Sequence, residues 1–189
     1  MALSGRVHTF RLDQTTGVSF PQYSGSLAVS ATVGSHSINF PNGVQNGQLS
    51  IEIGTSSPEW LSDITSNEAI KSSLALTMYD ELNFSEDDAN VAVLELMTDE
   101  GRLSRYYGNV TVEGFTNEGL TYIYVDKDVT ITGKGKPIYD NFVTADFTLE
   151  LKHGWNTVLR ERSGNDDEIE TLSVGNNTRI IWVVMQRGG

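Results

Sequence analysis

Apolar and polar residues alternate with a period of two along most of this chain, in short runs rich in β-branched and aromatic residues. Such alternation is typical of β-strands, because successive side chains point to opposite faces of a sheet. Gly, Asn, Asp and Ser separate the runs, as tight turns require. The pattern predicts strands over residues 6–12, 26–33, 48–53, 73–78, 91–97, 104–112, 121–125, 129–132, 143–152, 157–161, 168–172 and 179–185. These short, closely spaced strands predict an all-β fold, either an antiparallel β-sandwich or a barrel-like sheet.

No long polar linker interrupts this pattern, so we expect a single β-sandwich domain over residues 1–189. One stretch departs from the alternation and predicts a short helical segment over residues 57–71. Ser56 and Glu59 have the spacing of a capping box at its start, and a second turn is expected over 66–71. Apolar residues of the first turns then share one helical face. They are Trp60, Leu61 and Ile64.

The last strand carries the strongest architectural signal. Residues 180–185 are apolar at every position, so both faces of this strand should be buried. Trp182 then shares one side with Ile180 and Val184. The run over residues 91–97 is nearly as apolar. We therefore expect these two strands at the centre of the core.

A hairpin is expected around His153 and Gly154, with the strand ending at Lys152 returning as the strand over 157–161. A two-residue turn and a three-residue turn give opposite orientations of the second strand. The sequence therefore leaves open whether Trp155 faces the core or the solvent.

A second hairpin should follow, with residues 163–167 as its loop. In that register Arg162 faces Glu168 and Arg160 faces Glu170. Opposite charges across a strand pair each contribute a few tenths of a kcal/mol.

The segment Phe147–Val158, with its Leu-Lys-x-Gly-Trp-Asn sequence, resembles a segment of exported bacterial β-sheet lipoproteins and their relatives. The resemblance covers about a dozen residues. It implies a secreted, non-enzymatic domain that lies either at the bacterial cell surface or in the periplasm. The Cys that carries the lipid in such proteins is absent here.

Charge and composition narrow the chemistry further. The chain has 25 acidic and 13 basic residues and a formal net charge of −12, which argues against nucleic acid as a partner. It has no Cys, which excludes disulfides, thiol nucleophiles and cysteine metal sites. No apolar run reaches the roughly 20 residues of a membrane-spanning helix, so no membrane-spanning segment is expected.

The residues Met1–Gly5 lack the charged start and apolar stretch of a signal peptide. Either the protein is cytoplasmic, or its signal segment has been trimmed from an exported chain. The resemblance favours export to the periplasm or cell surface.

Motifs for catalysis and metal binding are weak. The three histidines are scattered, no Gly-x-Ser-x-Gly sequence occurs, and Gly133–Pro137 lacks the context of a phosphate-binding loop. The acidic clusters Glu86–Asp88 and Asp166–Glu168 are expected to be solvated turns, with Ca²⁺ binding as the alternative. We therefore expect no catalytic residue, no cofactor and no metal site.

Aromatic residues on the predicted strands are the best candidates for ligand contact. They are Tyr106, Tyr107, Tyr122, Tyr124 and Trp155. Adjacent Tyr106 and Tyr107 must point to opposite faces, so one of them should be exposed. The leading hypothesis is a non-catalytic binding or structural protein whose partner is a carbohydrate or another protein. The alternatives are a carbohydrate-binding module and a glycoside hydrolase that uses two carboxylates.

Overall fold

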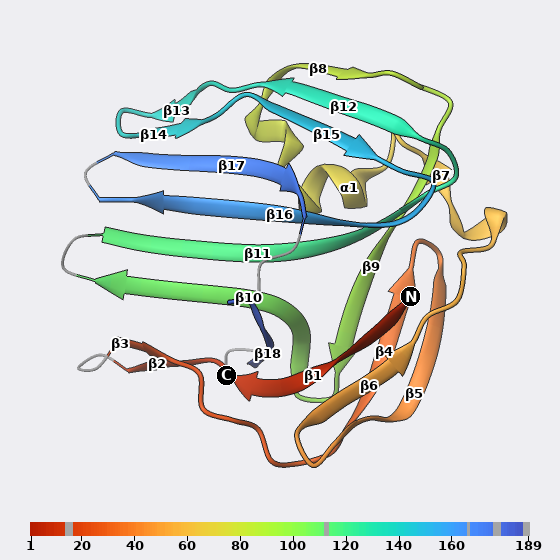
Figure 1. The fold of residues 1–189 in the computed structure, drawn as a ribbon, viewed down its shortest axis with the longest axis vertical. Coiled ribbons are helices and arrows are strands. Elements are labelled where there is room, and N and C mark those ends of the chain that lie inside the picture. Colours follow the sequence, from red (N-terminus) through yellow and green to blue (C-terminus); the bar gives the residue numbers. More distant parts are fainter. Residues whose placement is uncertain (14–16, 112–113, 166, 176–178, 187–189) are drawn as a thin grey trace.

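The computed structural model describes residues 1–13, 17–111, 114–165, 167–175 and 179–186 (Figure 1). Nearly all regular elements are strands. The strands are β1 (Ala2–Thr9), β2 (Arg11–Asp13), β3 (Gly17–Ser19), β4 (Leu27–Val33), β5 (His36–Gln45), β6 (Gln48–Glu52), β7 (Ser62–Asp63), β8 (Asp80–Phe84), β9 (Asn90–Thr98), β10 (Gly101–Thr111), β11 (Gly114–Val125), β12 (Val129–Lys134), β13 (Pro137–Tyr139), β14 (Phe142–Thr144), β15 (Phe147–Leu151), β16 (Gly154–Gly164), β17 (Glu168–Val174) and β18 (Ile181–Gln186). The helical pieces are η1 (Pro58–Trp60), α1 (Glu68–Ser73) and η2 (Leu76–Met78).

Eight strands close into a barrel, which occupies the middle and lower part of Figure 1. Their order is β11-β10-β18-β1-β6-β5-β4-β9, and the ring closes because β9 pairs with both β10 and β11. Most neighbours are antiparallel, although β1 and β18 run parallel. The expected all-β fold with barrel or sandwich character is confirmed.

The same sheet continues beyond the barrel through β16, β17, β14 and β13. A smaller sheet, β15-β12-β8, lies across the upper part of Figure 1. Together with α1 it packs on β9, β11, β16 and β17 around a second apolar core. The fold therefore combines a barrel with a two-layered sandwich.

The two cores share the strand β9. Val91 and Val93 point into the sandwich core, while Ala92, Leu94 and Leu96 point into the barrel. Because both faces are covered, an apolar residue is suitable at almost every position of this strand. The expectation that the run over 91–97 lies at the centre of the core is confirmed.

Strand β18 lies between β10 and β1, so its predicted central position is also confirmed. Trp182 is 3% exposed, its Nε1 donates to the Ser4 carbonyl oxygen at 3.0 Å, and its ring stacks with Tyr122. Gly5 has φ +143°, and a Cβ there would lie 3.0 Å from the indole Cδ1. Glycine at this position lets the indole lie directly against β1.

The helical segment differs in detail from the expectation. Ser57, not Ser56, precedes η1, and its side chain makes no capping hydrogen bond among the described residues. The α-helix forms at the predicted second turn, where Asn67 caps it. The strand expected over 73–78 is wrong, because these residues end α1 and form η2 instead. Leu74 and Leu76 pack in the sandwich core from these helical turns.

The expected hairpin at His153 and Gly154 is also wrong. Strand β15 pairs with β12, while β16 pairs with β11 and β17, so the connection crosses between the two sheets. Asn156 shapes this crossover, because its side chain accepts from the Lys152 N–H and donates to the carbonyl oxygens of Lys152 and Gly154. The sequence Leu-Lys-x-Gly-Trp-Asn therefore has a structural role in this chain.

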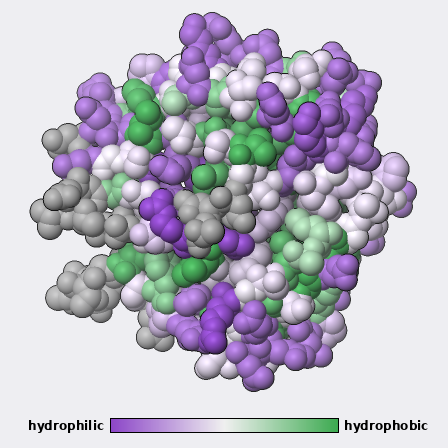
Figure 2. Space-filling view, in the orientation of Figure 1, coloured by the Kyte–Doolittle hydropathy of each residue, from purple (hydrophilic) through white to green (hydrophobic). Residues whose placement is uncertain are grey.

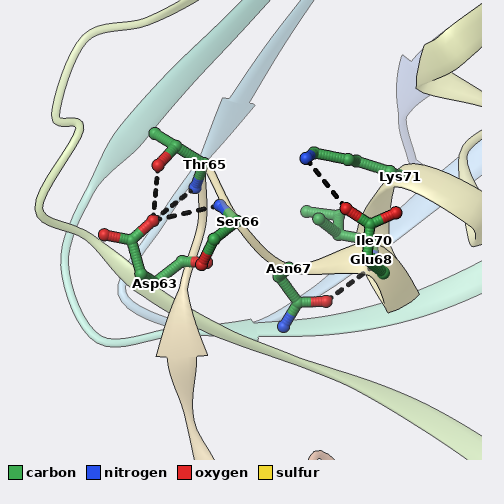
Figure 3. Close-up of polar contacts among 7 residues, drawn as sticks. All are labelled: Asp63, Thr65, Ser66, Asn67, Glu68, Ile70 and Lys71. Carbon is green, nitrogen blue, oxygen red and sulfur yellow. Dashed lines mark hydrogen bonds and ion pairs between the residues drawn. The ribbon is translucent and has the colours of Figure 1, made fainter.

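Helix α1 is anchored by its capping residue (Figure 3). The Asn67 Oδ1 accepts from the Ile70 N–H at 2.9 Å. Its Nδ2 donates to the Ser62 hydroxyl at 2.6 Å and to the Val91 carbonyl oxygen at 3.3 Å. One buried amide thus caps the helix and ties it to β7 and β9.

Replacing Trp182 by Ala should lower the free energy of unfolding by about 3–5 kcal/mol, because it empties the middle of the barrel core. Denaturant unfolding measures this loss. Trp182→Phe keeps an aromatic ring and should lose clearly less. Unfolding of Trp182→Ala at the same denaturant concentration as the parent would contradict the assigned core.

Replacing Asn67 by Ala should lower the free energy of unfolding by about 1–3 kcal/mol, because the cap and two further buried hydrogen bonds disappear. Asn67→Ser keeps a capping oxygen and should recover part of the loss. Thermal melts compare the variants. Equal melting of Asn67→Ala and the parent would show that this amide does not hold α1.

Candidate functional site

A groove lies where β9, β10 and β11 separate. Strand β9 pairs with β11 through Val91–Val93 and with β10 through Leu96–Met97. Between these regions, Leu94 and Glu95 pair with β4 but with neither β10 nor β11. Ladder pairing between β10 and β11 begins only at Arg105. The three strands therefore form a forked junction in the barrel wall.

The groove over this junction has a volume of about 620 Å³ and is bordered by α1. Its charged and aromatic side chains come from α1, β9, β10 and β16. They are Glu68, Glu95, Arg102, Arg105, Tyr106 and Arg160. A second hollow of about 270 Å³ shares Tyr106 and Arg160 and adds Asn117, Glu118 and Arg162. The shared residues make the two hollows neighbours along one face of the sheet.

Two arginines of these neighbouring hollows are held by carboxylates on β17. Arg160 donates from Nε (2.9 Å) and Nη2 (2.6 Å) to one oxygen of Glu170, whose side chain is fully buried. Arg162 pairs in the same way with Glu168. Both guanidinium groups are thereby fixed in orientation before any ligand arrives.

These contacts confirm the two ion pairs expected across the β16–β17 hairpin. The predicted register was wrong by two residues, because Gly164 pairs with Glu168 and Arg162 pairs with Glu170. The shift keeps every side chain on its predicted face. The ion pairs consequently form diagonally rather than directly across the ladder.

Arg105 is held without a carboxylate. Its Nη2 donates to the Ile180 carbonyl oxygen at 2.8 Å, and its guanidinium carbon lies 5.3 Å from the centre of the Trp182 ring. Its Nε is buried and has no hydrogen-bond partner among the described residues. Burial raises the pKa of the neighbouring Tyr122 hydroxyl, and the positive charge of Arg105 opposes that rise.

Tyr106 is the predicted site residue that lines the groove. Its hydroxyl donates to the Asn117 Oδ1 at 2.7 Å, and burial raises its pKa. The ring centres of Tyr106 and Phe20 are 5.9 Å apart, and the ring centres of Phe20 and Phe10 are 6.0 Å apart. A cluster of three aromatic rings therefore stands at this wall of the groove.

The other predicted site residues lie on the opposite face of the sheet. Tyr107 is half-buried beneath the guanidinium of Arg179. Tyr122 and Tyr124 are buried, and Tyr124 meets the edge of the Trp155 ring. Trp155 is half-buried against the barrel core. The structure thus brings Tyr106 to the groove and does not bring the other four residues there.

The acidic clusters are partly neutralised by neighbouring cations. Asp88 pairs with Lys127 at 2.8 Å, and Glu168 pairs with Arg162. Asp166 lies outside the described residues. In the part of the chain that the structure describes, no three His, Asp or Glu side chains gather as metal ligands.

The surface in Figure 2 is mainly hydrophilic, with hydrophobic residues in separate groups. Within the described ranges, no helix has the length and apolar character needed to cross a membrane. No protein-family model matches this sequence, no curated protein matches it, and no solved structure matches its fold.

Glu118 is a titrating group on the face of β11 that points away from the groove, beside Tyr107. Its side chain is fully buried and pairs with Arg179. Burial raises its pKa, Arg179 opposes the rise, and the charge of Glu161 adds to it. A carboxyl whose pKa is higher in the folded state stabilises the fold at low pH and loses that contribution as pH rises through the folded pKa.

Replacing Glu118 by Gln removes this titration. The melting temperature of Glu118→Gln, relative to the parent, should therefore be higher at pH 8 than at pH 4. Glu150→Gln, which changes an exposed carboxyl on β15, is the control for net charge. A relative melting temperature that falls with rising pH would show that Arg179 outweighs burial.

Proposed function

We propose that this chain is a non-catalytic, exported binding domain whose groove takes a saccharide. The observation that carries the proposal is the lining of the groove, where the half-buried ring of Tyr106 stands beside guanidinium and carboxylate groups from different elements. Sugars present hydroxyl groups that both donate and accept hydrogen bonds. Arginines supply donors, and Glu68 and Glu95 supply acceptors.

Size and rigidity support this proposal. The groove volume of about 620 Å³ lies within the range of small-ligand sites. Arg160 is fixed by the buried Glu170, and Tyr106 is fixed by Asn117 and Phe20. A site whose side chains are already held in place loses less entropy when it binds a ligand.

A glycoside hydrolase is the second candidate, because Glu68 and Glu95 line the same groove. Cleavage requires two carboxylates about 5–9.5 Å apart across the scissile bond. Release of reducing sugar ends should be absent in a binding domain. If the parent released reducing sugar ends and both Glu68→Gln and Glu95→Gln abolished this release, the protein would be an enzyme.

Export rests on the resemblance of the Phe147–Val158 segment to exported lipoproteins. Fractionation of cells that produce the full-length protein tests this part of the proposal. Recovery from the cytoplasm alone would contradict it.

The groove residues Tyr106 and Arg160 can be tested directly. Affinity electrophoresis against gels containing pectin, alginate, xylan, mannan or glucan should show retardation of the parent by at least one polysaccharide. Tyr106→Ala and Arg160→Ala should each weaken that binding by roughly tenfold or more, which corresponds to about 1.4 kcal/mol.

Tyr139→Ala is the matched control, because this ring is 72% exposed on β13 and does not line the groove. Tyr106→Phe keeps the ring and should retain more binding than Tyr106→Ala. Equal retardation of the parent and both groove variants would remove the groove from the proposal.

A further inference from the structure

We propose that the groove recognises a carboxylate on its ligand, so that the preferred saccharide contains uronic acid units. The inference rests on the proposed function and names the ligand class for the same site. Arg102 and Arg105 are the residues that bind the carboxylate.

The pairing of basic side chains singles out these two arginines. Among the described residues, every lysine side chain pairs with a carboxylate, and so do Arg160, Arg162 and Arg179. In the same ranges, the basic side chains described without such a pair are Arg6, Arg102 and Arg105. Both Arg102 and Arg105 line the groove. In a chain with a net charge of −12, two guanidinium groups without a carboxylate at one site point to an anionic group on the ligand.

The forked junction explains how both residues reach the same groove. They are three positions apart on β10, so their side chains leave opposite faces of the strand. The Arg105 side chain leaves β10 on the same face of the sheet as its neighbour Trp182, and this face points into the barrel. Because β9 leaves β10 at this point, the wall is open, and Arg105 lines both a small hollow at the junction and the groove outside.

The geometry of Arg105 suits a planar anion. Its Nη2 is occupied by Ile180, its face lies over Trp182, and its Nε has no partner among the described residues. A guanidinium held in a fixed plane forms hydrogen bonds of defined direction with a carboxylate. Arg102 is exposed on the same strand and supplies a second donor group.

The groove also carries charges that disfavour more highly charged ligands. Glu68 and Glu95 line it, and the whole chain is acidic. A polyphosphate or a densely sulfated chain would be repelled by this field. A singly charged carboxylate on each sugar unit meets less repulsion, while its hydroxyl groups can donate to the two glutamates.

Calorimetric titration with oligogalacturonate and oligoguluronate tests the inference, with methyl-esterified oligogalacturonate as the neutral probe and dextran sulfate as the sulfated one. The parent should bind at least one of the two uronate probes at least tenfold more tightly than the methyl ester. Arg102→Gln should weaken uronate binding tenfold or more and leave binding of the ester nearly unchanged.

Arg6→Gln is the matched control, because it removes an arginine without a carboxylate partner that lies outside the groove. It should bind uronate like the parent. Arg105→Gln should also weaken binding, but it can disturb Trp182, so Arg102→Gln and Arg6→Gln decide the outcome.

Four results would overturn the inference. Equal losses in Arg102→Gln and Arg6→Gln would indicate a general effect of charge. Binding of dextran sulfate alone would show that the groove recognises sulfate and not carboxylate. Binding of neutral glycans alone, still sensitive to Tyr106→Ala, would refute the uronate while the proposed function stands; no binding of any glycan would refute both.

Discussion

Strand β9 has to cover two cores and close a barrel at the same time, and the rest of the architecture depends on this constraint. Its alternate side chains enter the barrel and the sandwich, so neither face is available to solvent along Val91–Leu94. Its backbone pairs with β4 on one side and with β11 and then β10 on the other. A change of partner along one edge leaves residues that face neither partner, and the junction opens there.

The groove is a consequence of that change of partner. Regular pairing along the whole of β9 would leave no opening through which Arg105 could reach the outer face. Helix α1 borders the opening because Asn67 fixes it to β9. Strand β16 supplies arginines that are held by buried or half-buried carboxylates of β17. Core packing and the candidate binding site are thus set by the same strands.

Structural features that depend only on residues close together in the chain could be predicted from the sequence. The apolar runs over 91–97 and 180–185 revealed central strands because burial on both faces removes polar residues. The Arg160–Glu170 and Arg162–Glu168 pairs followed from one hairpin. Strand β5 was missed because most of its side chains are exposed or half-buried, which weakens the alternation. The crossover at His153–Gly154 was mistaken for a hairpin because the same turn residues suit both connections.

The groove itself could not be predicted, because its lining comes from segments far apart in the chain. Tyr106 was selected as an aromatic residue on a strand, and that choice was independent of the junction. Arg102 and Arg105 carry no motif. Their lack of a carboxylate partner becomes visible only when the positions of all the acidic side chains are known.

We propose that ligands bind at the forked junction of β9, β10 and β11. Amide chemical-shift mapping by NMR with oligogalacturonate locates the binding surface directly. We expect the largest shifts at Glu95, at Ser104–Tyr106 and at Gly119–Thr121. Shifts confined to the crossover around Trp155 or to the sheet edge at Tyr139 would contradict this proposal.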